Sequence, residues 1–237
     1  GGLNGTINIS NAAGGITLGN TVTANGSGSV TLLATGGLLT VNQLVSSTTG
    51  ALSLTGGTGV THGVNGDLTT GTTGTIGVTA TLNDVTMVDG TIYSTGSGQV
   101  DVTAATNVVL GEITTTSSAV NVTATAGAIT ETTAAETANL TGGVLTLTAS
   151  TGIGATGGVL DIETDATQLD LTSTTGGIFV TDLGAVQLGN GTGGVNTITS
   201  GNIEIVAANT ITTGGAISTG GLNGTINISN AAGGITL

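Results

Sequence analysis

Carboxylates are the side chains of this sequence best suited to chemistry, because its 237 residues include 13 Asp and Glu, one His and no Lys, Arg or Cys. Asp161, Glu163 and Asp165 occupy alternate positions. If Leu160 and Ile162 point inward, a strand there turns the three carboxylates to one outer face. Such hard oxygen ligands suit Ca²⁺. We expect a solvated acidic patch here with no metal or cofactor, and a Ca²⁺ site is the alternative.

An enzyme of this composition would need two carboxylates as general acid and base, as glycosidases use. Sugar-binding clefts also need aromatic and cationic groups, but Tyr93 and Phe179 are the only aromatic residues. The single histidine, His62, has no second His or Cys to share a metal with, so we expect a surface loop residue near Asp67. The sequence therefore predicts a protein that is not an enzyme, unless the fold sets two carboxylates face to face across a cleft.

The formal net charge of -13 restricts the partners of the chain. Nucleic acids, phosphates and anionic lipids are bound through cationic side chains, which are absent, so we expect no nucleic-acid partner. Apolar runs are only a few residues long, so we expect no direct membrane insertion of this segment. A hydrophobic content of 37% and a mean hydropathy of +0.45 predict a folded chain, with a thin aliphatic core because aromatic residues are so few.

Two copies of one segment set the long-range organisation. Residues 1–18 and 220–237 both read GGLNGTINISNAAGGITL, with an offset of 219 residues. This identity predicts a tandem repeat, with one 219-residue unit (1–219) followed by the start of the next (220–237), in a single continuous segment 1–237. The seam between units is then bounded by Gly1, Leu18, Gly220 and Leu237.

A shorter repeat recurs within the unit. Each copy of it contains two apolar residues separated by one other residue. The pairs are Ile7/Ile9, Val30/Leu32, Leu52/Leu54, Ile76/Val78, Val100/Val102, Val120/Val122, Leu145/Leu147, Leu169/Leu171, Val186/Leu188, Ile203/Ile205 and Ile226/Ile228. Successive pairs lie 17–25 residues apart. Apolar residues at alternate positions indicate strands with one buried face. Stacking one coil per interval predicts an all-β, right-handed parallel β-helix (β-solenoid) with about ten coils per 219 residues.

Glycine pairs mark the corners of the predicted coils, because glycine accepts tight turns at little steric cost. We expect strands to begin after pairs such as Gly14–Gly15, Gly142–Gly143, Gly157–Gly158, Gly176–Gly177 and Gly193–Gly194. A string of immunoglobulin-like sandwiches is the competing all-β interpretation, but it needs a bulkier core than this sequence supplies. Helices are disfavoured because Gly and Thr are poor helix formers and no 3.6-residue period appears.

Threonines follow the apolar pairs in five consecutive predicted coils and form a candidate surface ladder. Its members are Thr79, Thr103, Thr123, Thr148 and Thr172. The ladder is similar to the flat Thr arrays of ice-binding β-helices, and a glycan could also use such a face. The alternative is structural, because Thr is β-branched and forms stabilising cross-strand pairs.

The segments GSVTLLATGG, GQVDVTAATNVVLGEI and GGVLTLTASTGIG resemble the parallel β-helix shafts of filamentous haemagglutinin-type and autotransporter adhesins of Gram-negative bacteria. The resemblance is one of pattern, covers the whole chain and implies export to the cell surface. We therefore expect the structural shaft of an extracellular filament or adhesin fibre. Its partner would be itself, end to end along the filament and also laterally. An ice-binding or glycan-binding adhesin that uses the Thr ladder is the alternative.

Overall fold

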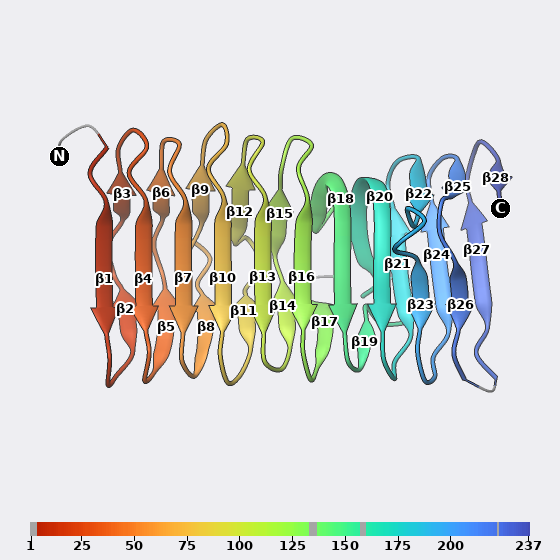
Figure 1. Cartoon of the computed structure of the whole chain (residues 1–237), viewed down its shortest axis with the longest axis horizontal. Helices are drawn as coiled ribbons and strands as arrows, with labels where there is room; N and C mark the ends of the chain where they lie inside the picture. The colour runs from red at the N-terminus through yellow and green to blue at the C-terminus, as the bar shows by residue number, and fades with distance from the viewer. Residues whose placement is uncertain (1–3, 133–136, 157–159, 222) are drawn as a thin grey trace.

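The strands of this chain stack into one parallel β-solenoid, as the computed structural model shows for residues 4–132, 137–156, 160–221 and 223–237 (Figure 1). The strands of these residues form a single 28-stranded sheet, and every pairing in it is parallel. The predicted all-β solenoid of about ten coils is confirmed. In this described part, no helix is long and apolar enough to cross a membrane.

Each of the first coils has three faces. The first face comprises β1 (Ile7–Asn11), β4 (Val30–Ala34), β7 (Leu52–Gly56), β10 (Ile76–Ala80), β13 (Val100–Ala104) and β16 (Val120–Ala124). The second face comprises β2 (Ile16–Leu18), β5 (Leu38–Val41), β8 (Gly59–His62), β11 (Val85–Met87), β14 (Val108–Leu110), β17 (Ala128–Glu131) and β19 (Gly152–Ile153). The third face comprises β3 (Val22–Ala24), β6 (Val45–Ser47), β9 (Leu68–Thr70), β12 (Ile92–Thr95) and β15 (Glu112–Thr114).

The later coils follow two long strands that turn a corner, β18 (Leu140–Ala149) and β20 (Ile162–Ser173). After them come β21 (Ile178–Asp182), β22 (Val186–Leu188), β23 (Val195–Thr197), β24 (Ile203–Ala207), β25 (Ile211–Thr213), β26 (Ile217–Thr219), β27 (Ile226–Asn230) and β28 (Ile235–Thr236). In Figure 1 the chain runs down the near face and up the far face while it advances to the right, so the coil is right-handed.

Side chains along each strand point alternately into the core and outward. In β10, Ile76, Val78 and Ala80 are buried, whereas Gly77 and Thr79 between them point outward. The third inward position of the first-face strands stays small in successive coils and holds Ala34, Gly56, Ala80, Ala104, Ala124 and Ala149. Small side chains at this position let the chain turn closely at the corner.

The cross-section of the coil changes at β20. This strand pairs with three later strands, since Ile162 is in register with Val180, Leu169 with Leu188, and Leu171 with Val195. After β20, the five-residue strands are β21, β24 and β27. They extend the second face, because Ile153 of β19 is followed in register by Ile178, Ile203 and Ile226.

Two details of the sequence interpretation are therefore wrong. Of the last three apolar pairs, Val186/Leu188 continues the first-face column only through Leu188, which is in register with Leu169, and the pairs that begin at Ile203 and Ile226 lie on the second face. Gly142–Gly143 lies inside the continuous strand β18 rather than before a strand. The strands expected after Gly14–Gly15, Gly176–Gly177 and Gly193–Gly194 do begin there, as β2, β21 and β23, and Gly157–Gly158 lies outside the described residues.

Candidate functional site

The Thr ladder forms an in-register column on the first face. Thr79 pairs with Thr103, Thr103 with Thr123, Thr123 with Thr148, and Thr148 with Thr172. All five side chains lie outside the core and are exposed or half-exposed. Thr55 precedes them in the same column and was not included in the expected set. The ladder therefore crosses six neighbouring coils.

The other two faces carry similar columns of hydroxyl side chains, which the sequence analysis did not predict. On the second face, the column contains Thr17, Thr40, Thr61, Thr86 and, after Val109, Thr130. On the third face, it contains Thr23, Ser46, Thr69, Ser94, Thr114 and Thr141. Because every face carries such a column, the ladder on the first face does not distinguish that face as a binding surface.

The outward column beside the first-face ladder is chemically mixed. It contains Thr31, Ser53, Gly77, Asp101, Asn121, Thr146 and Asp170. The first face therefore presents one row of hydroxyl groups and, next to it, a row that includes carboxylates and an amide. Two parallel rows of Thr do not occur along this stretch.

Amides and hydroxyls bind the surface carboxylates in the absence of cations. Asp101 accepts hydrogen bonds from the amides of Gln99 (2.7 Å) and Asn121 (2.8 Å). Asp84 accepts one from the Thr106 hydroxyl and two from Asn107, through its backbone N–H (2.8 Å) and its side-chain amide (3.0 Å). These bonds, that of Thr106 above all, lower the pKa of Asp84 and favour its charged form.

The acidic segment departs from the expected outward arrangement. Asp161 and Glu163 are only 5% and 1% exposed, whereas Leu160 is 44% exposed. The reason is that Asp161 lies against β21, where the Thr181 hydroxyl donates a hydrogen bond to it. Asp165 is exposed, so the three carboxylates do not share one solvated face. Within the described residues, no group of three or more His, Cys, Asp or Glu side chains could hold a metal ion.

Asp182 is a buried carboxylate that the sequence did not single out. It lies at the inward end of β21 and is fully buried. One oxygen accepts hydrogen bonds from the Thr164 hydroxyl (2.8 Å) and the Ala166 N–H (3.1 Å), and the other accepts one from the Gly184 N–H (2.9 Å). Burial nevertheless raises the pKa of Asp182, because desolvation disfavours its charged form. Its partners all belong to the fold, which gives it a structural role.

His62 is a core residue, not the expected surface loop residue. It ends β8, is fully buried and lies edge-on to Tyr93 with ring centroids 5.1 Å apart. Burial lowers the pKa of His62 to about 4, so its ring is neutral at pH 7. Nδ1–H donates to the Gly66 carbonyl (2.7 Å), because a carbonyl can only accept, and Nε2 therefore accepts from the Tyr93 hydroxyl (2.7 Å). Val60, two residues earlier in the same strand, also points inward, so strand alternation would have predicted that His62 lies in the core.

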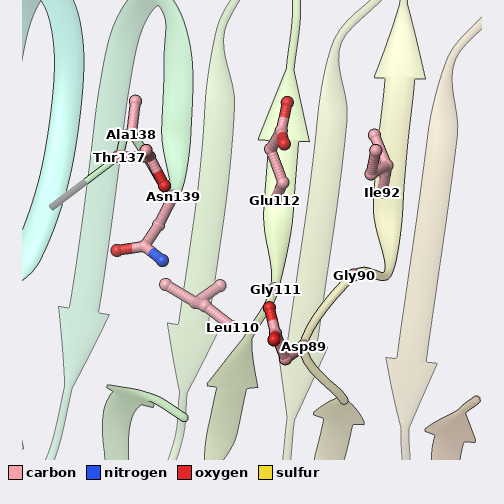
Figure 2. A pocket seen from close by; sticks show the side chains of 9 residues that line it. All are labelled: Asp89, Gly90, Ile92, Leu110, Gly111, Glu112, Thr137, Ala138 and Asn139. Carbon is pink, nitrogen blue, oxygen red and sulfur yellow. The ribbon is translucent and has the colours of Figure 1, made fainter. Parts of the chain in front are cut away.

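A surface hollow near carboxylates contains Asp89 and Glu112 (Figure 2). It has a volume of about 110 Å³, and Gly90, Ile92 and Asn139 also line it. Figure 2 shows the Glu112 carboxylate pointing away from Asp89. An acid and base pair for glycoside hydrolysis must flank the same bond from two sides. This hollow does not place its two carboxylates in that way.

The two copies of the duplicated segment differ in how far the solenoid covers them. Leu18 is 7% exposed in the first copy, where the next coil covers it, whereas its counterpart Leu237 is 84% exposed. Likewise, Ile16 is 8% exposed and its counterpart Ile235 is 40% exposed. Of the other seam residues, Gly220 is half-buried and Gly1 lies outside the described residues. An apolar hollow of about 300 Å³ lies among Ile217, Ile226, Ile228 and Leu237 beside the second copy.

The second copy does not return to the face of the first. Ile7 is stacked on Val30 in the first-face column, but its counterpart Ile226 belongs to the second-face column that begins at Ile16. In Figure 1, β1 points down on the near side and β27 points up on the far side. One 219-residue period thus corresponds to a non-integral number of coils, between nine and ten.

These features define the chain as a parallel β-solenoid with polar outer columns. Comparison of the chain with protein-family models, curated proteins and solved structures finds no match.

Proposed function

We propose that this chain is a structural shaft segment of an extracellular or cell-surface fibre, in which units join end to end and continue one solenoid. The observation that carries the proposal is that residues 220–237 repeat residues 1–18 and stack in register on the preceding coil, with Ile226 on Ile203 and Ile235 on Ile211. A following coil would bury the second copy as it buries the first. The resemblance to bacterial adhesin shafts supports the extracellular location and a bacterial origin.

The proposed mechanism is mechanical. The inter-coil hydrogen bonds of a solenoid run along its axis, so every coil adds a set of bonds in series with the last. The buried aliphatic columns follow the same axis, from Ile16 through Val60, Val108 and Ile153 to Ile203. Continuation from unit to unit would give a shaft without a flexible linker at the seam.

The negative surface suits a fibre that must stay separate from its neighbours. With a net charge of -13 and no cations, like charges on adjacent shafts repel each other. Divalent cations would bridge surface carboxylates of adjacent shafts and bring the shafts together laterally. The ice-binding or glycan-binding alternative stays a prediction, and the occurrence of hydroxyl columns on all three faces favours the structural role.

Electron microscopy and light scattering of the purified chain test the proposal. We expect filaments as wide as one solenoid, whose length and mass increase with protein concentration. Ile226→Asp should prevent their formation, because it adds a charge to the apolar hollow beside the second copy. Asn227→Asp is the matched control, since it adds the same charge at the neighbouring exposed position of β27 and should leave assembly intact. A chain that stays monomeric at all concentrations would contradict the proposal.

A further inference from the structure

A small hollow beside β21 brings together two carboxylates from neighbouring strands. Ile162 of β20 is in register with Val180 of β21, and Asp161 directly precedes Ile162. Phe179 of β21 is in register with Glu204 of β24. Asp161, Phe179 and Glu204 line one hollow of about 40 Å³. The fold therefore places the carboxylates of Asp161 and Glu204 around the same space, although 43 residues separate them in the sequence (204 minus 161).

Asp161 is a buried carboxylate with one unsatisfied oxygen. The residue is only 5% exposed. The Thr181 hydroxyl donates a hydrogen bond to Oδ2, whereas Oδ1 is buried and has no hydrogen-bond partner among the described residues. Removing a carboxylate oxygen from water without a compensating partner is costly. A buried oxygen of this kind, in the wall of a hollow, indicates a bound water or ion.

Other carboxylates of the chain show what Asp161 lacks. Asp182 is fully buried, and its two oxygens share three hydrogen bonds. Asp84 accepts three on one oxygen. For Asp161 the described residues supply one donor, the Thr181 hydroxyl, and the chain contains no Lys or Arg that could neutralise its charge. A cation that neutralises Asp161 must therefore come from solution.

We propose that this hollow binds Ca²⁺ between the carboxylates of Asp161 and Glu204. Carboxylate oxygens are the hard ligands that Ca²⁺ prefers, and Ca²⁺ accepts irregular ligand sets and gives up water more readily than Mg²⁺ does. A hollow of about 40 Å³ has room for the ion and about two waters, since one water needs ~10–15 Å³.

The ion ties β20 to β24 across β21, next to the place where the cross-section of the coil changes. Water supplies most of its ligands, so the affinity is weak, with a Kd of about 10⁻⁴–10⁻³ M, as in extracellular calcium modules. The site shares only Asp161 with the acidic segment considered in the sequence. It lies within one chain and does not depend on fibre assembly.

Urea unfolding measures the binding, at chain concentrations where light scattering shows monomers. About 10 mM Ca²⁺ is about 10–100 times the expected Kd, so the unfolding equilibrium constant should fall about 10- to 100-fold relative to NaCl of the same ionic strength. Asp161→Asn and Glu204→Gln should each lose most of this effect. Asp89→Asn is the matched control, because it removes one carboxylate charge at an exposed position outside the hollow and should keep the effect.

Two results of this titration would overturn the site. Equal Ca²⁺ effects in the unmodified chain and all three variants would show a general attraction of cations to an acidic chain. An unmodified chain that responds to Ca²⁺ no more than to NaCl would show that a proton, not a cation, neutralises Asp161.

Nuclear magnetic resonance locates the ion. Phe179 is the only Phe and Tyr93 the only Tyr, so their ring signals are identified by residue type. Mn²⁺ is a paramagnetic cation that also prefers oxygen ligands. A small amount of Mn²⁺ should broaden the Phe179 signals, and Ca²⁺ should restore them by competition. Tyr93 should stay sharp, because it is buried in the core three ladder steps from β20.

The variants complete this measurement. Asp161→Asn should abolish the broadening of the Phe179 signals, and Glu204→Gln makes the same test if Asp161→Asn does not fold. Equal broadening of the Phe179 and Tyr93 signals, or broadening of Phe179 that both variants retain, would overturn the inference. Neither result would bear on the proposed shaft function, because both are measured on single chains.

Discussion

At the scale of single residues, neutral polar groups perform the work that cations perform in most proteins. Surface carboxylates such as Asp84 and Asp101 are bound by hydroxyl and amide groups. Inside the coil, Ser47 and Thr70 donate hydrogen bonds to the carbonyls of Gly28 (2.6 Å) and Gly50 (2.8 Å). These bonds let polar side chains occupy inward positions without an unpaired group. Neutral hydroxyl and amide groups thus bind Asp84 and Asp101 in a chain that contains no Lys or Arg.

The His62–Tyr93 pair makes stability depend on pH. The pKa of His62 is about 4 in the folded chain and 6.5 in the unfolded chain, so the unfolded state binds more protons between these values. The free energy of unfolding should therefore fall as the pH is lowered from 6.5 to 4, by about 3 kcal/mol over the window. Denaturant titrations at a series of pH values measure this loss.

His62→Gln provides the control, because an amide can accept from Tyr93 and donate to the Gly66 carbonyl but does not titrate. We expect the variant to lose most of the pH dependence between pH 6.5 and 4. Asp182 acts in the opposite sense, since its raised pKa adds stability as the pH falls and Asp182 becomes protonated. Equal slopes for the variant and the unmodified chain would refute a buried neutral His62.

The sequence contained the signal for some of these residues and not for others. Val60 and His62 are two residues apart in one strand, so their side chains point to the same side and alternation alone predicts that His62 points inward. Asp161, Ile162, Glu163 and Thr164 are consecutive and all buried, so both sides of this segment are covered. Alternation predicts one buried and one exposed side of a strand, which is why the acidic segment was placed incorrectly.

At the scale of the strand, the hydroxyl columns stabilise neighbouring coils. Thr123 lies between Thr103 and Thr148 in the first-face ladder. We expect Thr123→Val to change the free energy of unfolding by less than about 0.5 kcal/mol, because Val keeps the β-branched shape. Thr123→Ala should lower it by about 0.2–1 kcal/mol, because the cross-strand pairs are lost. Denaturant midpoints of the two variants provide the measurement, and equal losses would show that branching is not what the ladder contributes.

Some corners of the coil require glycine because the corner of a neighbouring coil lies against them. A Cβ at Gly98 would approach the carbonyl oxygen of Gly74 to 1.8 Å, whereas a Cβ at Gly77, in the middle of β10, would have only the Leu52 carbonyl oxygen at 4.0 Å. Gly98→Ala should therefore destabilise the chain by about 1–3 kcal/mol. Gly77→Ala is the matched control and should stabilise it by about 0.4–1 kcal/mol, since alanine restricts the unfolded chain. Thermal unfolding of both variants shows whether stability depends on the contact at the corner or only on the number of glycines.

Strand periodicity was a good guide to the regular coils and failed where one strand turns a corner. The first eight apolar pairs, from Ile7/Ile9 to Leu169/Leu171, do form one column. The next pair does not, because β20 presents Leu169 and Leu171 to two different strands, β22 and β23. Apolar alternation identifies a strand and its buried side, but it does not identify the face on which that strand lies.

At the scale of the whole molecule, the repeat is longer than nine coils and shorter than ten. Nine ladder steps lead from Ile16 to Ile226, the counterpart of Ile7. At ~4.8 Å per coil, one unit therefore advances about 45 Å along the axis. Because the second copy lies on the opposite side in Figure 1, neighbouring units should also be rotated about the axis. The Thr ladder would then change sides between units instead of forming one continuous stripe.

The central claim is that the chain forms a fibre whose axis is the axis of the solenoid. Cryo-electron microscopy of filaments grown from the purified chain tests it most directly. The account predicts a ~4.8 Å repeat parallel to the filament axis, with an axial spacing of about 45 Å between successive units. Filaments with the ~4.8 Å repeat perpendicular to their axis would mean that solenoids associate side by side, and that result would contradict the account.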